Sequence, residues 1–241
     1  FEDCTISDNT AITGAGMLLK GSSDQLTDID FQRNIANEYG GAIYSTAQSD
    51  FQVSECEFNE NMANYGGCFA LLDTHPQVTQ SVFEGNRAMT SGGVFYFIRE
   101  DQVPAEITLC SFSNNSASVR GGVFAFKDTT PLVYQGTQIL SNTFSKNYAG
   151  KGGDLSADVP GNSLVHVVAN TFSGRLDLKY YIDKPEGFDF LNNTELLTPV
   201  DQDVYVSPTG SDANDGLTES TPFRTIQHAL SVLDTNSGNA K

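Results

Sequence analysis

The sequence predicts an all-β fold, a right-handed parallel β-helix (solenoid) of about seven coils with a small strand–loop–helix segment at its C-terminus. A phrase of Phe or Ile, then Asn, Ala and a Gly pair recurs six times, with 25 to 32 residues between anchors. A period of this length is typical of repeat proteins. The apolar runs are short and rich in β-formers, and no helical period is found between Ala11 and Phe172. The right hand follows the twist preference of parallel connections.

An asparagine occupies the third place after the anchor in every copy. The anchors are Ile6, Phe31, Phe58, Phe83, Phe112 and Phe144, and the asparagines are Asn9, Asn34, Asn61, Asn86, Asn115 and Asn147. Asn tolerates left-handed backbone and bonds to the local backbone at turns. Stacked Asn side chains can also bond one another along a column of strands. We therefore predict that these six residues form a structural ladder at one corner of the coils.

A pair of glycines follows in five copies and predicts a second corner. The pairs begin at Gly40, Gly66, Gly92, Gly121 and Gly152, whereas the first copy has Gly14-Ala15. Glycine suits a positive φ or a close approach of two backbones. Packing and corner chemistry account for the Asn and Gly columns without any ligand.

Charge and composition exclude some partners. The chain has 241 residues, with 30 acidic and 13 basic side chains and a net charge of −17. Nucleic acid and anionic membrane surfaces are therefore poor partners. No run of 18 apolar residues is present, so no membrane span is expected.

Three of the four cysteines share one place in the repeat. Cys4, Cys56 and Cys110 each lie two residues before an anchor, which puts them on the inward face of a strand. Neighbouring coils are about 4.8 Å apart, so Cys4 and Cys56 would be about 10 Å apart, beyond disulfide reach. We expect these three and Cys68 to be buried free thiols. No Cys or His spacing indicates a metal site.

The chain divides into three parts. Residues 1–175 carry the repeats, 176–200 are expected to close the end of the solenoid, and 201–241 form the strand–loop–helix segment. The segment's loop, Asp212–Gly216, has the residues of an Asx turn and only a faint likeness to a calcium loop. Two sequons, at Asn114 and Asn192, are candidate glycosylation sites.

Acidic side chains recur beside the first anchors and form the candidate site. Asp3, Asp28 and Glu55 lie three residues before an anchor, and Asp30 and Glu57 lie one residue before. Three interpretations remain open: a solvated acidic face, a Ca²⁺ site formed by Asp28, Asp30, Glu55 and Glu57, and a pair of catalytic carboxylates. The solvated face is favoured, because no Arg or Lys column and no exposed aromatic platform accompany the acids. No catalytic residue is therefore assigned.

The FxxN…GGA(I/V) phrase of residues 1–175 resembles the repeats of polymorphic outer membrane proteins, a family of surface-exposed adhesins. The tail, YVSPTGSDANDGLTESTPFRTIQHAL, is similar to the segment that caps the N-terminal end of pectin-lyase-like β-helices. The resemblance implies a non-catalytic structural or adhesive module of an extracellular or cell-surface protein. The alternative is a carbohydrate-active or carbohydrate-binding β-helix.

The tail also suggests a partner. A cap-like segment after the repeats could cover the first coil of a flanking module of the same protein, or of a second copy in a head-to-tail filament. Carbohydrate or another cell-surface ligand is the other expected partner, and no cofactor other than Ca²⁺ is expected.

Overall fold

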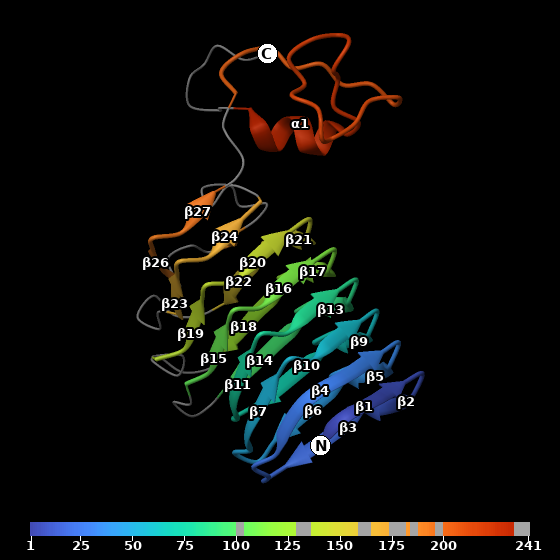
Figure 1. Cartoon of the computed structure of the whole chain (residues 1–241), viewed down its shortest axis with the longest axis vertical. Helices are drawn as coiled ribbons and strands as arrows, with labels where there is room; N and C mark the ends of the chain where they lie inside the picture. Colours follow the sequence, from blue (N-terminus) through green and yellow to red (C-terminus); the bar gives the residue numbers. More distant parts are fainter. Residues whose placement is uncertain are drawn as a thin grey trace.

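The coils stack in register along one axis, with the N-terminal coil at one end (Figure 1). The computed structural model describes residues 1–99, 104–128, 136–158, 165–173, 182–183, 188–195 and 200–233. All pairings between its named strands are parallel, and six coils contribute to all three of its sheets. This confirms the predicted parallel solenoid.

The first sheet contains 14 strands and includes the anchor positions. Its strands are β1 (Glu2–Ser7), β4 (Gln25–Gln32), β7 (Asp50–Ser54), β8 (Glu57–Asn59), β11 (His75–Thr79), β12 (Val82–Glu84), β15 (Glu106–Thr108), β16 (Ser111–Ser113), β19 (Gln138–Leu140), β20 (Thr143–Ser145), β23 (Val165–Val168), β24 (Thr171–Phe172), β26 (Phe188–Leu191) and β27 (Thr194–Glu195). The long strand β4 pairs with β7 through its first half and with β8 through its second. Strand β4 therefore covers positions that later coils divide between two separate strands.

Two smaller sheets complete each coil. The second sheet has six strands, β2 (Thr10–Thr13), β5 (Ile35–Tyr39), β9 (Met62–Tyr65), β13 (Arg87–Ser91), β17 (Ser116–Arg120) and β21 (Tyr148–Lys151). The third has seven, β3 (Met17–Lys20), β6 (Ile43–Thr46), β10 (Phe69–Leu72), β14 (Phe95–Arg99), β18 (Phe124–Asp128), β22 (Leu155–Asp158) and β25 (Ile182–Asp183).

The six asparagines form a continuous chain of hydrogen bonds at the corner between the first and second sheets. Each Nδ2 donates to the Oδ1 of the asparagine in the next coil, from Asn9 to Asn147, over 2.9 to 3.1 Å. From Asn34 onward, Nδ2 also donates to the carbonyl oxygen of the preceding coil's anchor, as Asn61 does to Phe31 over 2.8 Å. The same Oδ1 atoms accept from backbone N–H groups, so these buried amides are satisfied.

The left-handed backbone lies one residue earlier than the sequence analysis expected. The positive φ angles belong to the residue before each asparagine: Asp8, Arg33, Glu60, Gly85, Asn114 and Lys146. The ladder asparagines are not among the positive-φ residues. A side chain at a left-handed corner points to solvent, whereas the next residue points inward and can bond the coil above. The ladder thus depends on Asn for its amide and not for its tolerance of αL backbone.

The two glycines of each pair have different roles. The first has a positive φ, for example +63° at Gly40 and +67° at Gly66. A Cβ on the second would collide with the neighbouring coil, since at Gly41 it would lie 2.2 Å from the Gly67 carbonyl oxygen. The corner therefore requires two glycines, the first for its positive φ and the second because the neighbouring backbone leaves no room for a Cβ.

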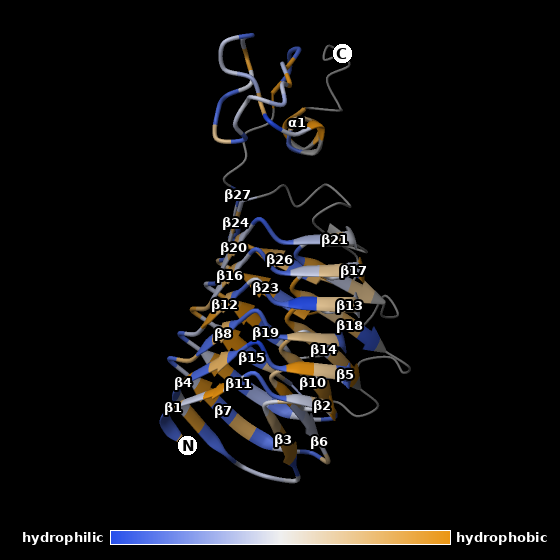
Figure 2. Cartoon of the chain, turned by 90° about the vertical axis from the view of Figure 1, so that its right-hand side faces the viewer, coloured by the Kyte–Doolittle hydropathy of each residue, from blue (hydrophilic) through white to orange (hydrophobic). Residues whose placement is uncertain are grey.

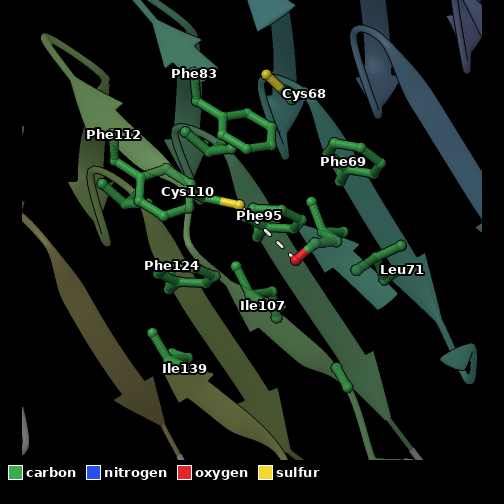
Figure 3. Close-up of a cluster of buried hydrophobic side chains, with 14 of the residues drawn as sticks. Cys68, Phe69, Leu71, Phe83, Phe95, Ile107, Cys110, Phe112, Phe124 and Ile139 are labelled. Atoms are coloured by element: carbon green, nitrogen blue, oxygen red, sulfur yellow. Dashed lines mark hydrogen bonds between the residues drawn. The ribbon is translucent and has the colours of Figure 1, made fainter. Parts of the chain in front are cut away.

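Stacked phenylalanine rings fill the interior. Phe31, Phe58, Phe83, Phe112, Phe144 and Phe172 follow one another with ring centroids 4.6 to 5.1 Å apart. Across the core they meet residues of the third sheet such as Phe95 and Phe124 (Figure 3). Aromatic pairs at this spacing add to the free energy of area burial.

Three cysteines are buried and one is not. All four are free thiols, but Cys4 is exposed because it lies in the first described coil, where only β4 covers its strand. This corrects the expectation of four buried thiols. Burial raises the pKa of Cys56, raises that of Cys110 to about 12 and raises that of Cys68 well above its usual value. The buried thiols therefore behave as small apolar groups.

The cysteine column continues as a second asparagine ladder, which the sequence analysis did not identify. Asn142 donates to Asn170 over 3.0 Å, and Asn170 to Asn193 over 3.1 Å. Cys110 lies directly before them, and its N–H donates to Asn142 over 2.8 Å. Its thiol points to the Val78 carbonyl oxygen at 3.8 Å, the kind of acceptor that an Asn amide uses in this column (Figure 3).

The stack continues beyond the last recognisable repeat. Strands β25, β26 and β27 pair with β22, β23 and β24, so the described part of 176–200 adds strands to the solenoid. The other residues of that segment lie outside the described residues, as does Arg175, which follows Phe172 by three residues where the six copies have Asn.

The tail has its own small core. Phe223, Ala229 and Val232 pack together with Val200 and Val204. The helix α1 (Ile226–Val232) begins after Thr225, whose side chain caps its N-terminus by accepting from the His228 N–H. Isolated bridges, Val200 to Leu233 and Val206 to Phe223, replace the expected strand.

Replacing Asn61 by Leu should lower the free energy of unfolding by about 3 kcal/mol. The change removes the bonds to Asn34, Asn86 and Phe31 and leaves buried partners unpaired. Chemical denaturation would measure it. Asn59→Leu is the control, because Asn59 is less buried and makes one long bond, to Glu57 at 3.3 Å. Equal effects of the two changes would contradict the ladder's role.

Alkylation of the native protein should modify Cys4 and spare the three buried thiols. After denaturation without reductant all four should react, because each is a free thiol. Mass spectrometry distinguishes the two states. Labelling of Cys68 in the native protein, or a loss of two hydrogens, would contradict the assigned core.

Candidate functional site

The acids three residues before the anchors lie at a left-handed corner. Asp3, Asp28 and Glu55 have φ angles of 50°, 52° and 56°, and their side chains are exposed. Gln80, Leu109 and Ser141 continue the same column in later coils. The acidic part of this corner is therefore confined to the first three coils.

The acids one residue before the anchors lie on the outer face of the first sheet. Asp30 and Glu57 are register neighbours on β4 and β8. Asp30 accepts a hydrogen bond from the Gln32 side chain, and Glu57 accepts one from Asn59 at 3.3 Å. Within the described residues, no group of three or more His, Cys, Asp or Glu side chains is placed to hold a metal ion. The structure thus brings Asp30 and Glu57 together as neighbours but does not gather the four predicted ligands into one cluster.

A shallow pocket lies further along the same sheet. It has a volume of about 400 Å³ and is lined by Asp50, His75, Pro76, Gln77, Pro104, Ala105, Glu106, Gly136 and Gln138. The register places Gln77, Glu106 and Gln138 side by side on consecutive coils. Carboxylate, amide and imidazole groups next to two prolines offer both hydrogen bonds and apolar contacts to a ligand.

The pocket continues a column of polar side chains that the sequence analysis did not single out. Gln25 donates to Gln52, and Gln52 to Gln77, both over 3.4 Å. At the other end of this column, Nδ1 of His166 lies 3.0 Å from Oδ2 of Asp189. The residue types of outward columns vary from coil to coil. This polar column can therefore be recognised only from the register of the strands in the structure.

Tyrosines also reach the surface, but on other sheets than the acids. Tyr39, Tyr44 and Tyr65 are half-buried at the edge between the second and third sheets. Their rings stack with centroids 5.5 Å (Tyr39 to Tyr65) and 5.8 Å (Tyr39 to Tyr44) apart. Burial raises the pKa of Tyr44, helped by the nearby Tyr39. Aromatic faces of this kind are available for contact with a ligand.

Both sequons follow from the corner chemistry. Asn114 and Asn192 are exposed and have positive φ angles, 57° and 55°. Each precedes a ladder asparagine, Asn115 or Asn193, and then a hydroxyl residue that opens the next strand. The sequons are accessible, but the fold alone explains why these residues occur together. Glycosylation at either site stays a prediction.

One carboxyl group is buried at the end of the first ladder. Asp154 occupies the core column that Cys68, Val94 and Val123 hold in earlier coils. Its Oδ1 accepts a hydrogen bond of 2.9 Å from Asn147, whose amide has no further asparagine to bond. Burial raises the pKa of Asp154 to about 7, although the bond from Asn147 acts in the opposite direction.

The loop of the tail is held by its own side chains. Asp212 accepts hydrogen bonds from the N–H groups of Arg224 and Thr225, both at 2.9 Å. Asp215 accepts from the Leu217 N–H and from the Thr221 hydroxyl. At Asp212 burial is the largest single influence and raises the pKa, but the bonds from Thr225 and Arg224 together bring it below its usual value. At Asp215 the bonds from Thr221 and Leu217 lower the pKa. The bond from Leu217 to Asp215 is that of an Asx turn, whereas Asp212 ties the loop to the residues just before α1.

A comparison with protein families decides the kind of fold. The model described as "Right handed beta helix region" matches residues 1–172, which is well over half of the chain. The chain belongs to this right-handed β-helix family. The match confirms the predicted hand of the solenoid. The matched range ends at Phe172, the last ring of the phenylalanine stack.

A relative among curated proteins is similar over about two thirds of this chain. "Probable autotransporter YfaL" of Escherichia coli (strain K12) is 27% identical over 176 residues, covering 64% of this chain and 14% of the relative. The chain thus spans about a seventh of that protein's length. No solved structure matches. Within the described residues, no helix has the length and apolar character needed to cross a membrane.

The stability of this β-helix should fall as the pH rises from about 4 to about 7, because of Asp154. Over that window the folded protein keeps the proton of Asp154, whereas the unfolded chain has lost it. The resulting loss in the free energy of unfolding is at most about 4 kcal/mol. Asp154→Asn keeps an acceptor for Asn147 and should remove this part of the pH dependence.

Chemical denaturation at several pH values would check this prediction. Glu55→Gln, at an exposed corner, makes the same chemical change from carboxyl to amide and serves as the control. If Asp154→Asn and Glu55→Gln showed the same pH profile as the unchanged protein, the assignment of a buried neutral carboxyl would be wrong.

Proposed function

We propose that this chain is a non-catalytic structural module of a cell-surface or secreted protein, and that its outer faces make adhesive contacts. The observation that carries the proposal is the right-handed β-helix that the family model matches over residues 1–172, together with 27% identity to a probable autotransporter.

The physical basis is that the inward and outward side chains of each strand have different roles. Inward columns are filled by Phe, Ala, Gly and ladder Asn, which hold the coils together. Outward columns are free to vary without loss of core packing, so recognition can be built there coil by coil. A fold of this kind also supports enzymes, so the function has to be argued from its surfaces.

Carbohydrate binding is the second candidate, favoured by the shallow pocket and by the tyrosines. The pocket places Gln77, Glu106 and Gln138 in a row beside two prolines. Amide and carboxylate groups pair with sugar hydroxyls, and flat apolar side chains pack on the faces of sugar rings. The pocket is open and shallow, as suits binding along a polymer.

Two narrower expectations also remain proposals. The first is that calcium would relieve the repulsion among Asp28, Asp30, Glu55 and Glu57. The ion would have to draw Asp28 and Glu55 toward the neighbouring pair Asp30 and Glu57, because the structure does not gather all four. The tail would cover a coil of a flanking module or of a second copy. Support for the tail's role comes from Ile226 and Leu230, which are 70% and 62% exposed on a helix whose other face is buried.

Surface exposure and a panel of polysaccharides together test the proposal. Antibodies against the β-helix should label intact cells that make the full protein, without permeabilisation. The purified chain should release no sugar fragments from acidic or neutral polysaccharides. Retention of a polysaccharide by the chain, lost in Gln77→Ala/Gln138→Ala, would establish the second candidate. Cleavage that is abolished by Asp30→Asn would overturn the non-catalytic assignment.

A further inference from the structure

The outer face of the second sheet carries exposed apolar side chains in most of its coils. Its inward side is a column of alanines, including Ala88, Ala117 and Ala149. The large apolar residues that it exposes are Ile12 (65%), Ile35 (38%), Met89 (51%), Val119 (46%) and Tyr148 (48%). Figure 2 is drawn from the side on which this sheet lies in Figure 1. Apolar side chains gathered on one face mark a contact surface.

Charge divides this face into two halves. The half formed by β2, β5 and β9 carries exposed Glu38 and Glu60, while Asp8 and Arg33 pair with each other at 2.7 Å. The other half, formed by β13, β17 and β21, carries Arg87, Lys146 and Lys151, all exposed. In a chain with net charge −17, a positively charged half-face is unusual, and it favours contact with an acidic surface.

The same face provides that partner when it meets a second copy of itself. Because the six strands stack in register, a two-fold axis parallel to the strands, between β9 and β13, exchanges the two halves. It places β9 opposite β13, β5 opposite β17 and β2 opposite β21. Each negative half then faces a positive half, and the apolar side chains meet between them.

We propose that the outer face of the second sheet is a self-complementary surface that pairs two copies of this chain with their solenoid axes antiparallel. Such a contact is isologous, since each copy uses the same residues. With the solenoid axes parallel, the positive half, which carries Arg87 and Lys151, would face the positive half of the other copy, so repulsion disfavours that arrangement. The surface goes beyond the proposed function and does not depend on where the protein is located.

The size of the face indicates a weak, reversible contact. Five strand spacings of about 4.8 Å give a height of about 24 Å, and strands of four or five residues are about 13 to 17 Å wide. A stable interface buries about 800 Å² on each partner, so this flat footprint of roughly 310 to 410 Å² is about half of that, as expected of a transient contact. Repulsion between the two acidic chains is screened beyond about 8 Å at physiological ionic strength, whereas charges in contact are screened less.

Sedimentation velocity of the full chain, from micromolar to millimolar concentration at physiological salt, tests the proposal. One variant reverses the positive half, Arg87→Glu/Lys151→Glu, and another reverses the negative half, Glu38→Lys/Glu60→Lys. Each alone should associate about tenfold more weakly, because attraction becomes repulsion at several places. An equimolar mixture of the two should regain association, because each reversed half then faces an opposite charge.

Glu57→Lys/Glu84→Lys is the control, with the same charge change on the first sheet as the negative-half variant. It should not weaken association. All these side chains are exposed, so circular dichroism and melting temperature should match the unchanged protein. A chain that stays monomeric throughout, unchanged association in both reversed variants, or a mixture that stays dissociated would each overturn the proposal.

Discussion

The buried asparagine ladder is the interaction on which the rest of the structure depends. A coil that turns at a corner leaves backbone N–H and C=O groups that the sheets do not pair, and these would be costly to bury unbonded. Each ladder Asn pairs a backbone N–H of the coil before it and donates to an anchor carbonyl, as Asn86 does to Phe58. The amide therefore fixes the corner and also the register between coils. Once the register is fixed, every other column follows from it.

The phenylalanine stack and the two glycines are consequences of that register. Rings 4.6 to 5.1 Å apart require anchors that superimpose from coil to coil. The second glycine is required because successive corners approach so closely that a Cβ at Gly67 would lie 2.2 Å from the Gly93 carbonyl oxygen. Inward positions are therefore constrained by the neighbouring coils, whereas outward positions are constrained by solvent alone. This difference explains why architecture and function are encoded in separate columns.

Inward columns repeat in the sequence, so they could be predicted from it. The period, the Phe–Asn spacing and the Gly pairs predicted the parallel β-helix. The second ladder was missed because its column changes chemistry, from Cys56 through Ser81 and Cys110 to Asn142, while keeping one geometry. Cys4 shares that column but is exposed, since its burial depends on coverage by other coils and not on its own place. The candidate surfaces could not be predicted, because the pocket and the tyrosines combine residues from columns without a common pattern.

The end of the first ladder shows how far one interaction extends through the fold. Asn147 has the amide of a ladder residue, and Asp154, from a different column of the same coil, accepts its hydrogen bond. A neutral carboxyl can accept this bond without the cost of burying a charge, which is why burial and the raised pKa occur together. Among the described residues, the second ladder, Asn142 to Asn193, extends beyond this point. The carboxyl of Asp154 thus takes the place of a further asparagine, so that the buried amide of Asn147 keeps an acceptor for its N–H groups.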